Sequence, residues 1–131
     1  MTPDGFAELA GGFPEAVEGV RYGNRTWTVA GCGFAWERPL TKADVKRYGE
    51  ATPPDGPIVA LRVDDLNEKE AVLAAGHDGV FDIAHFNGYP AVLVQLRAVR
   101  KRVLRELMTD AWLACAPERL AEAFVDRRRG H

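Results

Sequence analysis

Residues 21–36, Arg-Tyr-Gly-Asn-Arg-Thr-Trp-Thr-Val-Ala-Gly-Cys-Gly-Phe-Ala-Trp, form the stretch that decides the fold. Apolar and polar side chains alternate over residues 25–30, which is the period of a strand with one buried face. Trp27 lies on the face that this pattern buries. Gly23-Asn24 and Gly31-Cys32-Gly33 flank the run and predict chain reversals, because glycine and asparagine accept positive φ. The stretch therefore predicts two or three antiparallel strands joined by tight turns.

The remaining sequence predicts helices and further strands around this hairpin. Helices are expected over residues 2–10, 42–49, 66–75 and 99–115, with a last helix after Pro117, and strands over 20–22, 25–30, 34–37, 58–63, 80–85 and 91–96. Thr41 and Asp65 are each followed three residues later by an acid, which is a capping signal. Asn87-Gly88 predicts a hairpin between the last two strands. This order predicts a two-layer α+β domain with an antiparallel sheet and helices packed on one side.

The length and composition predict a single domain, residues 1–131. A chain of 131 residues matches the usual size of one domain and buries a sizeable core without a metal or disulfide. Residues 38–57 interrupt the strand pattern and include three prolines over 53–57, so we expect a loop with a short helix inserted between strands. Trp112 falls on the apolar stripe of the 99–115 helix, which predicts that it anchors this helix to the sheet.

The sequence also predicts a compartment. It holds no apolar run of the ~18 residues that a membrane span needs, and its first residues lack the basic start of a signal peptide. Cys32 and Cys115 form neither a framework nor a CxxC pair, so two thiols are expected in place of a bridge. These observations predict a cytoplasmic protein with no membrane partner.

The charge distribution leaves two interpretations open. The net charge of −2 argues against a strong nucleic-acid binder that ignores sequence. Residues 97–131 nevertheless hold nine Arg or Lys against five Asp or Glu. This excess either serves an anionic partner or lies on solvated helix faces balanced by acids elsewhere in the chain.

Three blocks of the sequence resemble the MmcQ/YjbR-like family. They are residues 20–36 (VRYGNRTWTVAGCGFAW), 80–94 (VFDIAHFNGYPAVLV) and 110–117 (DAWLACAP), in the family's order. The resemblance implies an α+β fold similar to secretion-chaperone-like and CyaY-like proteins. It also implies DNA binding, the label that the family commonly carries. Members often have Gly-Lys-x-Phe-Ala at the hairpin turn, and here Cys32 replaces that lysine, so one expected phosphate contact is missing.

Two groups of residues are candidates for nucleic-acid contact. Arginine binds phosphate with a bidentate fork, and aromatic rings stack on bases. The candidates are Arg21, Asn24 and Arg25 near the first turn, and Arg100, Lys101 and Arg105 on the basic helix. In the alternative interpretation, the aromatic residues near the turn are core, Asn24 serves the turn, and the arginines pair with acids such as Glu18.

A functional cleft is expected beside these residues, formed by Tyr22, Trp27, His85 and Asn87. His85 has no metal-ligand spacing to cysteine or another histidine, so a structural role is the alternative, and neither a metal nor a cofactor is expected. A nucleophilic Cys32–His85 pair would require the fold to bring the two together. We therefore predict a non-enzymatic domain that binds DNA or another nucleic acid weakly, with a protein-binding adaptor or chaperone-like module as the alternative.

Overall fold

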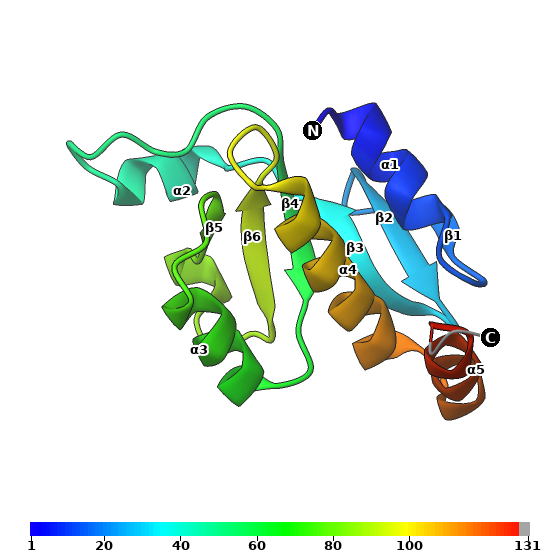
Figure 1. Ribbon diagram of the computed structural model, residues 1–131. Coiled ribbons are helices and arrows are strands. Elements are labelled where there is room, and N and C mark those ends of the chain that lie inside the picture. Colours follow the sequence, from blue (N-terminus) through cyan, green and yellow to red (C-terminus); the bar gives the residue numbers. More distant parts are fainter. Residues whose placement is uncertain (129–131) are drawn as a thin grey trace.

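The computed structural model describes residues 1–128 and contains one six-stranded antiparallel sheet in the order β1-β2-β3-β4-β6-β5 (Figure 1). The strands are β1 (Val17–Arg21), β2 (Asn24–Val29), β3 (Cys32–Glu37), β4 (Ile58–Arg62), β5 (Val80–Phe81) and β6 (Ala91–Gln95). The helices are α1 (Pro3–Gly11), α2 (Lys42–Arg47), α3 (Leu66–Ala74), the 3₁₀ helix η1 (Ala84–Phe86), α4 (Lys101–Cys115) and α5 (Glu118–Arg128).

The stretch 21–36 folds as predicted into antiparallel strands, with shifted turns. β1 and β2 are joined by Tyr22 and Gly23, whose φ angles are 52° and 78°. β2 and β3 are joined by Ala30 and Gly31, with φ angles of 49° and 81°. Two consecutive positive φ values match the twist of flanking strands. The predicted turn at 31–33 is therefore wrong in part, because Cys32 already pairs with β2.

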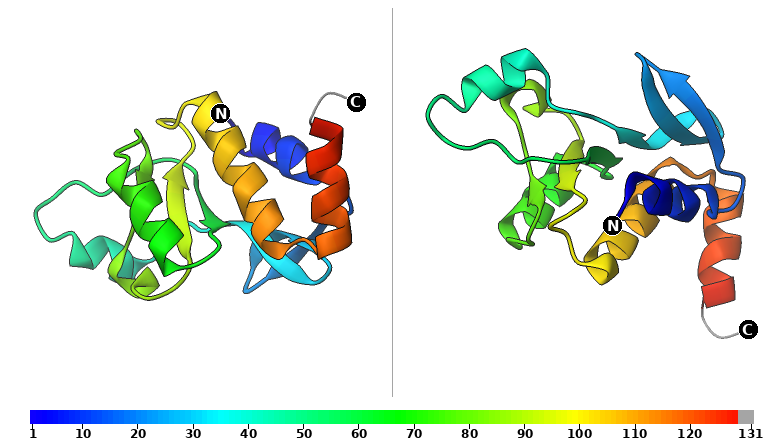
Figure 2. Two further views of the ribbon diagram at one scale, coloured as in Figure 1. Left: turned by 60° about the horizontal axis from the view of Figure 1, so that its bottom comes forward. Right: turned by 90° about the horizontal axis from the view of Figure 1, so that it is seen from above.

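The sheet has two different faces. The four longer helices, α1, α3, α4 and α5, cover one face, while α2 and η1 flank the other (Figure 2). The main core lies under the longer helices and includes Trp27, Phe34 and Leu61, all fully buried. A smaller cluster on the opposite face includes Ala60 and Leu93. The predicted α+β architecture, with helices packed on one side of an antiparallel sheet, is confirmed.

Trp112 is a core residue, as its position on the helical stripe predicts. Its side chain is fully buried, and its Nε1 donates to the Pro14 carbonyl oxygen at 3.0 Å. Its ring centroid lies 4.9 Å from that of Phe124 and 6.1 Å from that of Phe13. Trp112 therefore joins α4 to both ends of the chain and to the sheet.

The strand predicted over 80–85 is confirmed at its start, where β5 pairs antiparallel with β6, but its extension to residue 85 and the hairpin at 87–88 are wrong. β5 ends at Phe81, and the chain then forms η1 before β6. Lys69 explains the difference, because its buried Nζ donates to the carbonyl oxygens of Phe86 at 2.6 Å and Tyr89 at 2.9 Å. It also pairs with Asp82 at 3.1 Å. These contacts hold residues 84–90 as a compact loop instead of an extended strand.

The 38–57 segment forms a wall beside the smaller cluster. Thr41 and Asp44 form the predicted capping box at the start of α2. Leu40 packs against the cluster, and Arg38 donates to Asp44 at 3.0 Å. Burial opposes ionisation of Asp44, but hydrogen bonds from Thr41 and Arg38 outweigh it, so its pKa lies below the usual carboxyl value. The predicted loop of 51–57 contains no helix or strand.

The expectation of two separate thiols is wrong, because Cys32 and Cys115 form a disulfide across 83 residues of sequence. The bridge joins the first residue of β3 to the last residue of α4. The spacing of the two cysteines in the sequence did not indicate this disulfide, because only the packing of α4 across β3 brings Cys32 and Cys115 together. Within residues 1–128, no helix is both long and apolar enough to cross a membrane.

Candidate functional site

A pocket of about 600 Å³ opens on the sheet face opposite α4, between the β1–β2 turn, the 38–57 segment and η1. Its lining residues come from β1, the β1–β2 turn, β2, β3, β4, η1 and two adjoining loops. They are Arg21, Tyr22, Asn24, Thr26, Gly33, Trp36, Arg38, Pro39, Thr41, Arg62, His85, Phe86 and Tyr89. The volume lies within the range of roughly 300–1,000 Å³ that is typical of ligand sites.

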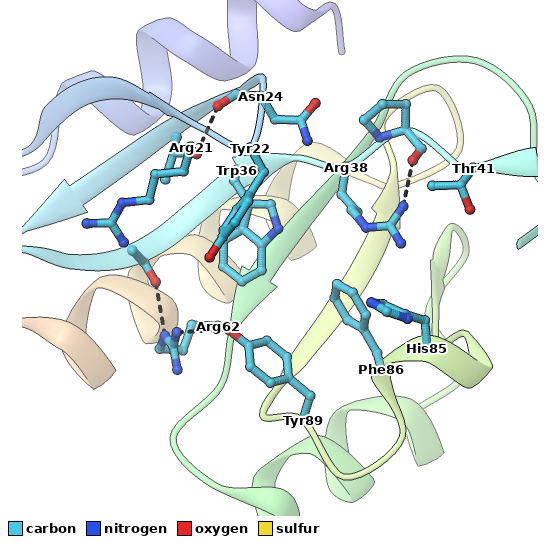
Figure 3. A pocket seen from close by; sticks show the side chains of 13 residues that line it. Arg21, Tyr22, Asn24, Trp36, Arg38, Thr41, Arg62, His85, Phe86 and Tyr89 are labelled. Carbon is cyan, nitrogen blue, oxygen red and sulfur yellow. Dashed lines mark hydrogen bonds between the residues drawn. The ribbon is translucent and has the colours of Figure 1, made fainter. Parts of the chain in front are cut away.

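Aromatic rings form much of the pocket surface (Figure 3). The Trp36 and Tyr89 rings meet edge to face with centroids 6.5 Å apart, and Phe86 lies 5.5 Å from Tyr89 in the same manner. Tyr22 stands at the rim, fully exposed at the tip of the first hairpin. Phe86 is buried in the smaller cluster, so the rings of Tyr22, Trp36 and Tyr89 are the ones that can stack on planar groups of a ligand.

Three arginines surround these rings, and each is held by a backbone carbonyl. Arg21 Nη2 donates to the Gly31 carbonyl oxygen at 3.0 Å, and Arg62 Nε donates to the Gly33 carbonyl oxygen at 3.0 Å. Arg38 Nη1 donates to the Pro39 carbonyl oxygen at 2.6 Å. A guanidinium has five N–H groups, so these bonds fix each side chain while donors remain for an anion.

The arginines also lie over the aromatic rings. The Arg62 guanidinium carbon is 5.7 Å from the centroid of Tyr89, and that of Arg38 is 5.5 Å from the centroid of Phe86. Cation–π contacts at this distance favour the observed side-chain orientation. No residue lining the pocket is an aspartate or glutamate. Arg38 forms an ion pair with Asp44, outside the lining, which offsets its charge. The positive charge of the pocket therefore comes mainly from Arg21 and Arg62.

Four of the predicted site residues meet at this pocket, namely Arg21, Tyr22, Asn24 and His85. Arg21 and Asn24 are directly paired across β1 and β2, so their side chains share the open face. Tyr22 is fully exposed, which contradicts the alternative that it belongs to the core. Asn24 belongs to β2 and not to the turn.

Six of the predicted site residues lie outside the pocket, and three of them come from β2 and the loop that follows η1. Trp27 is fully buried beneath the helices, so the expectation that it lines a cleft is wrong. Arg25 alternates with Asn24 along β2 and faces the helical side, where it pairs with Glu18 at 3.0 Å. The Arg25 hydrogen bond lowers the pKa of Glu18. Asn87 is exposed but does not line the pocket, although its neighbours Phe86 and Tyr89 do.

The basic helix does not join this surface. Arg100, Lys101 and Arg105 lie at the exposed start of α4, which packs on the covered face of β3 and β4. Arg100 borders a separate hollow that includes His77 and Asp78. A single binding surface containing both arginine groups is therefore excluded by the fold. The Cys32–His85 pair is excluded as well, since the sulfur of Cys32 is bonded to Cys115.

Sequence reasoning missed Trp36, Arg38, Arg62, Phe86 and Tyr89. A signal existed for Arg62, because the period of two places it on the same face as Ile58 and Ala60, opposite the core face of Leu61. No local signal existed for Arg38 or Tyr89. Their loops reach the pocket through tertiary packing.

The comparisons with known proteins identify relatives but no activity. The chain is 42% identical over 126 residues to Uncharacterized protein Rv2570 of Mycobacterium tuberculosis, covering 95% of each chain. Uncharacterized protein Mb2600 of Mycobacterium bovis matches equally well. No family model matches the chain.

A solved structure shares the fold. It is a protein from Pseudomonas syringae determined by the Northeast Structural Genomics Consortium, with a TM-score of 0.66 and 13% identity over 88% of this chain and 99% of that chain. This likeness concerns the α+β fold alone. The identity to the mycobacterial proteins, in contrast, extends over nearly the full length of both partners, and the chain therefore belongs to the same family as Rv2570 and Mb2600.

Proposed function

We propose that the protein is a non-enzymatic binding module for single-stranded nucleic acid, with the open-face pocket as its binding site. The observation that carries this proposal is the grouping of three arginines with the accessible rings of Tyr22, Trp36 and Tyr89 around one pocket whose lining holds no acid. Arginine neutralises phosphate, and aromatic rings accept bases of any sequence by stacking. The resemblance to MmcQ/YjbR-like proteins agrees with this proposal and stays a prediction.

A single strand fits the pocket better than a duplex. The bases of a duplex are stacked within the helix, so pocket rings such as Trp36 and Tyr89 could reach only its backbone and groove edges. An unpaired base can turn out and lie against a ring, where stacking stabilises binding by about 1–3 kcal/mol per base. We therefore expect single strands to bind more tightly than duplexes of the same sequence.

The test is fluorescence anisotropy with a labelled 12-nucleotide single strand and its duplex, at 50 and 200 mM salt. If Arg21, Arg38 and Arg62 all contact phosphate, the slope of log K against log salt is about −2 for a single strand. The dissociation constant then rises about 20-fold between these salt concentrations. No binding of the single strand at 50 mM salt would refute the proposal.

A matched pair of variants tests the position of the site. Arg21→Met and Arg105→Met each remove one exposed positive charge, but only Arg21 lines the pocket. We expect Arg21→Met to reduce the salt slope by about 0.7 and Arg105→Met to leave it unchanged. Equal effects of the two substitutions would mean that binding reflects overall charge and not the pocket.

A protein-binding adaptor is the second candidate, and the edge strand β1 favours it. β1 ends the sheet order, and Val17 and Val20 are 62% and 69% exposed. An edge with unpaired backbone groups can accept an extended peptide as an additional strand. Capture of a single protein that persists at 200 mM salt and is lost in a Val17→Lys/Val20→Lys variant would favour this function.

A further inference from the structure

The disulfide lies at the point where two of the pocket arginines are anchored. Gly31 and Gly33 flank Cys32, and their carbonyl oxygens accept the hydrogen bonds of Arg21 and Arg62, each at 3.0 Å. A Cβ added to Gly33 would lie 3.5 Å from Arg21 Nη1, so this guanidinium lies directly beside the same segment. The Sγ of Cys115 is 3.6 Å from the Gly33 carbonyl oxygen.

The strand segment that carries these carbonyls is supported mainly on one side. Cys32 and Gly33 pair with β2, whereas β3 pairs with β4 only at residues 35–37. A bulge in the β2–β3 ladder, between Trp27 and Thr28, interrupts the register beside this segment. The bond to Cys115 is therefore the covalent link that ties the start of β3 to the helical layer.

We propose that the Cys32–Cys115 disulfide is a redox-modification site that sets the ligand affinity of the pocket by holding the 31–33 segment in place. This inference rests on the proposed function, because it concerns the same pocket. With the disulfide closed, the carbonyls that orient Arg21 and Arg62 are fixed. With it open, the segment loses its covalent link to α4 and keeps its pairing to β2 and the burial of the neighbouring Phe34, so the carbonyls that support both arginines are held less firmly.

The modification is reduction by a dithiol. A thiolate of the reductant attacks one sulfur, the S–S bond breaks, and the second reductant thiol resolves the mixed disulfide. Each cysteine gains one proton, while the reductant gives up two electrons and is oxidised to its own disulfide. Cys32 and Cys115 are both half-buried and not fully enclosed, so a small dithiol can approach them.

Opening the disulfide should weaken binding without removing the site. Trp36 lies where β3 pairs with both β2 and β4, and Tyr89 lies in the loop that Lys69 holds, so stacking on these two rings persists. The two arginines would have to be ordered again when the ligand binds, and each reordered side chain lowers affinity. We expect the dissociation constant for the single strand to rise about tenfold on reduction.

Hydrogen exchange tests the coupling independently of any ligand. Exchange is measured on the protein as purified under oxidising conditions and after treatment with dithiothreitol. We expect faster exchange at 31–34 in the reduced protein, while β4 and β6 stay protected. Unchanged exchange at 31–34 would overturn the inference, and so would loss of protection throughout the chain, because the effect would then be global unfolding.

Anisotropy with the labelled 12-nucleotide single strand tests the consequence for binding. A Cys32→Ser/Cys115→Ser variant should bind like the reduced protein, and dithiothreitol should not alter its affinity. Equal affinity of oxidised and reduced protein would overturn the redox inference while the proposed function stands. Absence of binding in both forms would refute the proposed function, and the hydrogen-exchange result would still decide whether the disulfide controls the segment.

Discussion

Opening the Cys32–Cys115 disulfide should lower the free energy of unfolding by about 4–5 kcal/mol. The two cysteines are 83 residues apart, so the bridge closes a long loop in the unfolded chain. In the chain-entropy model, a loop of this length restricts the unfolded ensemble by about 4.5 kcal/mol at 25 °C. A domain of this size has a total stability of roughly 7–20 kcal/mol, so the reduced protein should remain folded.

Urea denaturation followed by tryptophan fluorescence measures this loss, on oxidised and on reduced protein. With an m value of about 2 kcal/mol/M, the midpoint should fall by roughly 2 M on reduction. Alkylation of unfolded protein without reductant is the control, and no carbamidomethyl group should be added to Cys32 or Cys115 while the bridge is closed. A midpoint shift below about 0.5 M would contradict the reasoning, because the bridge would then not constrain the unfolded chain.

Three further substitutions test the core and the walls of the pocket. Trp112→Ala should lower the free energy of unfolding by about 3–5 kcal/mol in a chemical melt. Trp112→Phe should lower it by less, because phenylalanine keeps an aromatic ring and loses only the N–H donor. A decrease under about 1 kcal/mol for Trp112→Ala would show that Trp112 is not a core residue. Lys69→Met should lower the free energy of unfolding by about 3 kcal/mol, because Asp82 and two loop carbonyls lose their partner. An unchanged free energy of unfolding would show that these contacts do not hold the loop. Because the pKa of Asp44 is lowered in the folded protein, its ionised carboxylate stabilises the fold above pH ~4, the usual carboxyl pKa. This stabilisation is lost as the pH falls through the lowered pKa. The difference in free energy of unfolding between the unsubstituted protein and Asp44→Asn should therefore be present at pH 7 and shrink toward pH 2. A gap that does not change with pH would contradict that assignment.

Sequence reasoning identified most elements of the fold because their signals are local. The alternation at 25–30 identified β2, and the apolar stripe with Trp112 identified α4. The caps at Thr41 and Asp65 marked the starts of α2 and α3. The errors occurred where a distant contact overrides local preference. Asn87-Gly88 favours a hairpin by itself, but Lys69, about twenty residues earlier in the chain, holds the preceding residues in a compact loop.

The candidate site was only partly accessible to the same reasoning. Arg21 and Tyr22 could be identified because they flank a turn, and turns reach the surface. Arg25 appeared equivalent by composition, yet the strand period places it on the covered face beside Glu18. The basic helix appeared to extend the same surface, although packing of α4 places it on the other side of the sheet.

By itself, the sequence determined most of the strands, the main helices and the apolar residues that separate a buried face from an open one. These features depend on periods of two and 3.6 residues, which neighbouring side chains establish along the chain. Only the tertiary structure decided that Cys32 meets Cys115 and that Arg38, Arg62 and Tyr89 surround one pocket. Such contacts join residues that are far apart in sequence, and they exist only after the sheet order and the helix packing have brought them together.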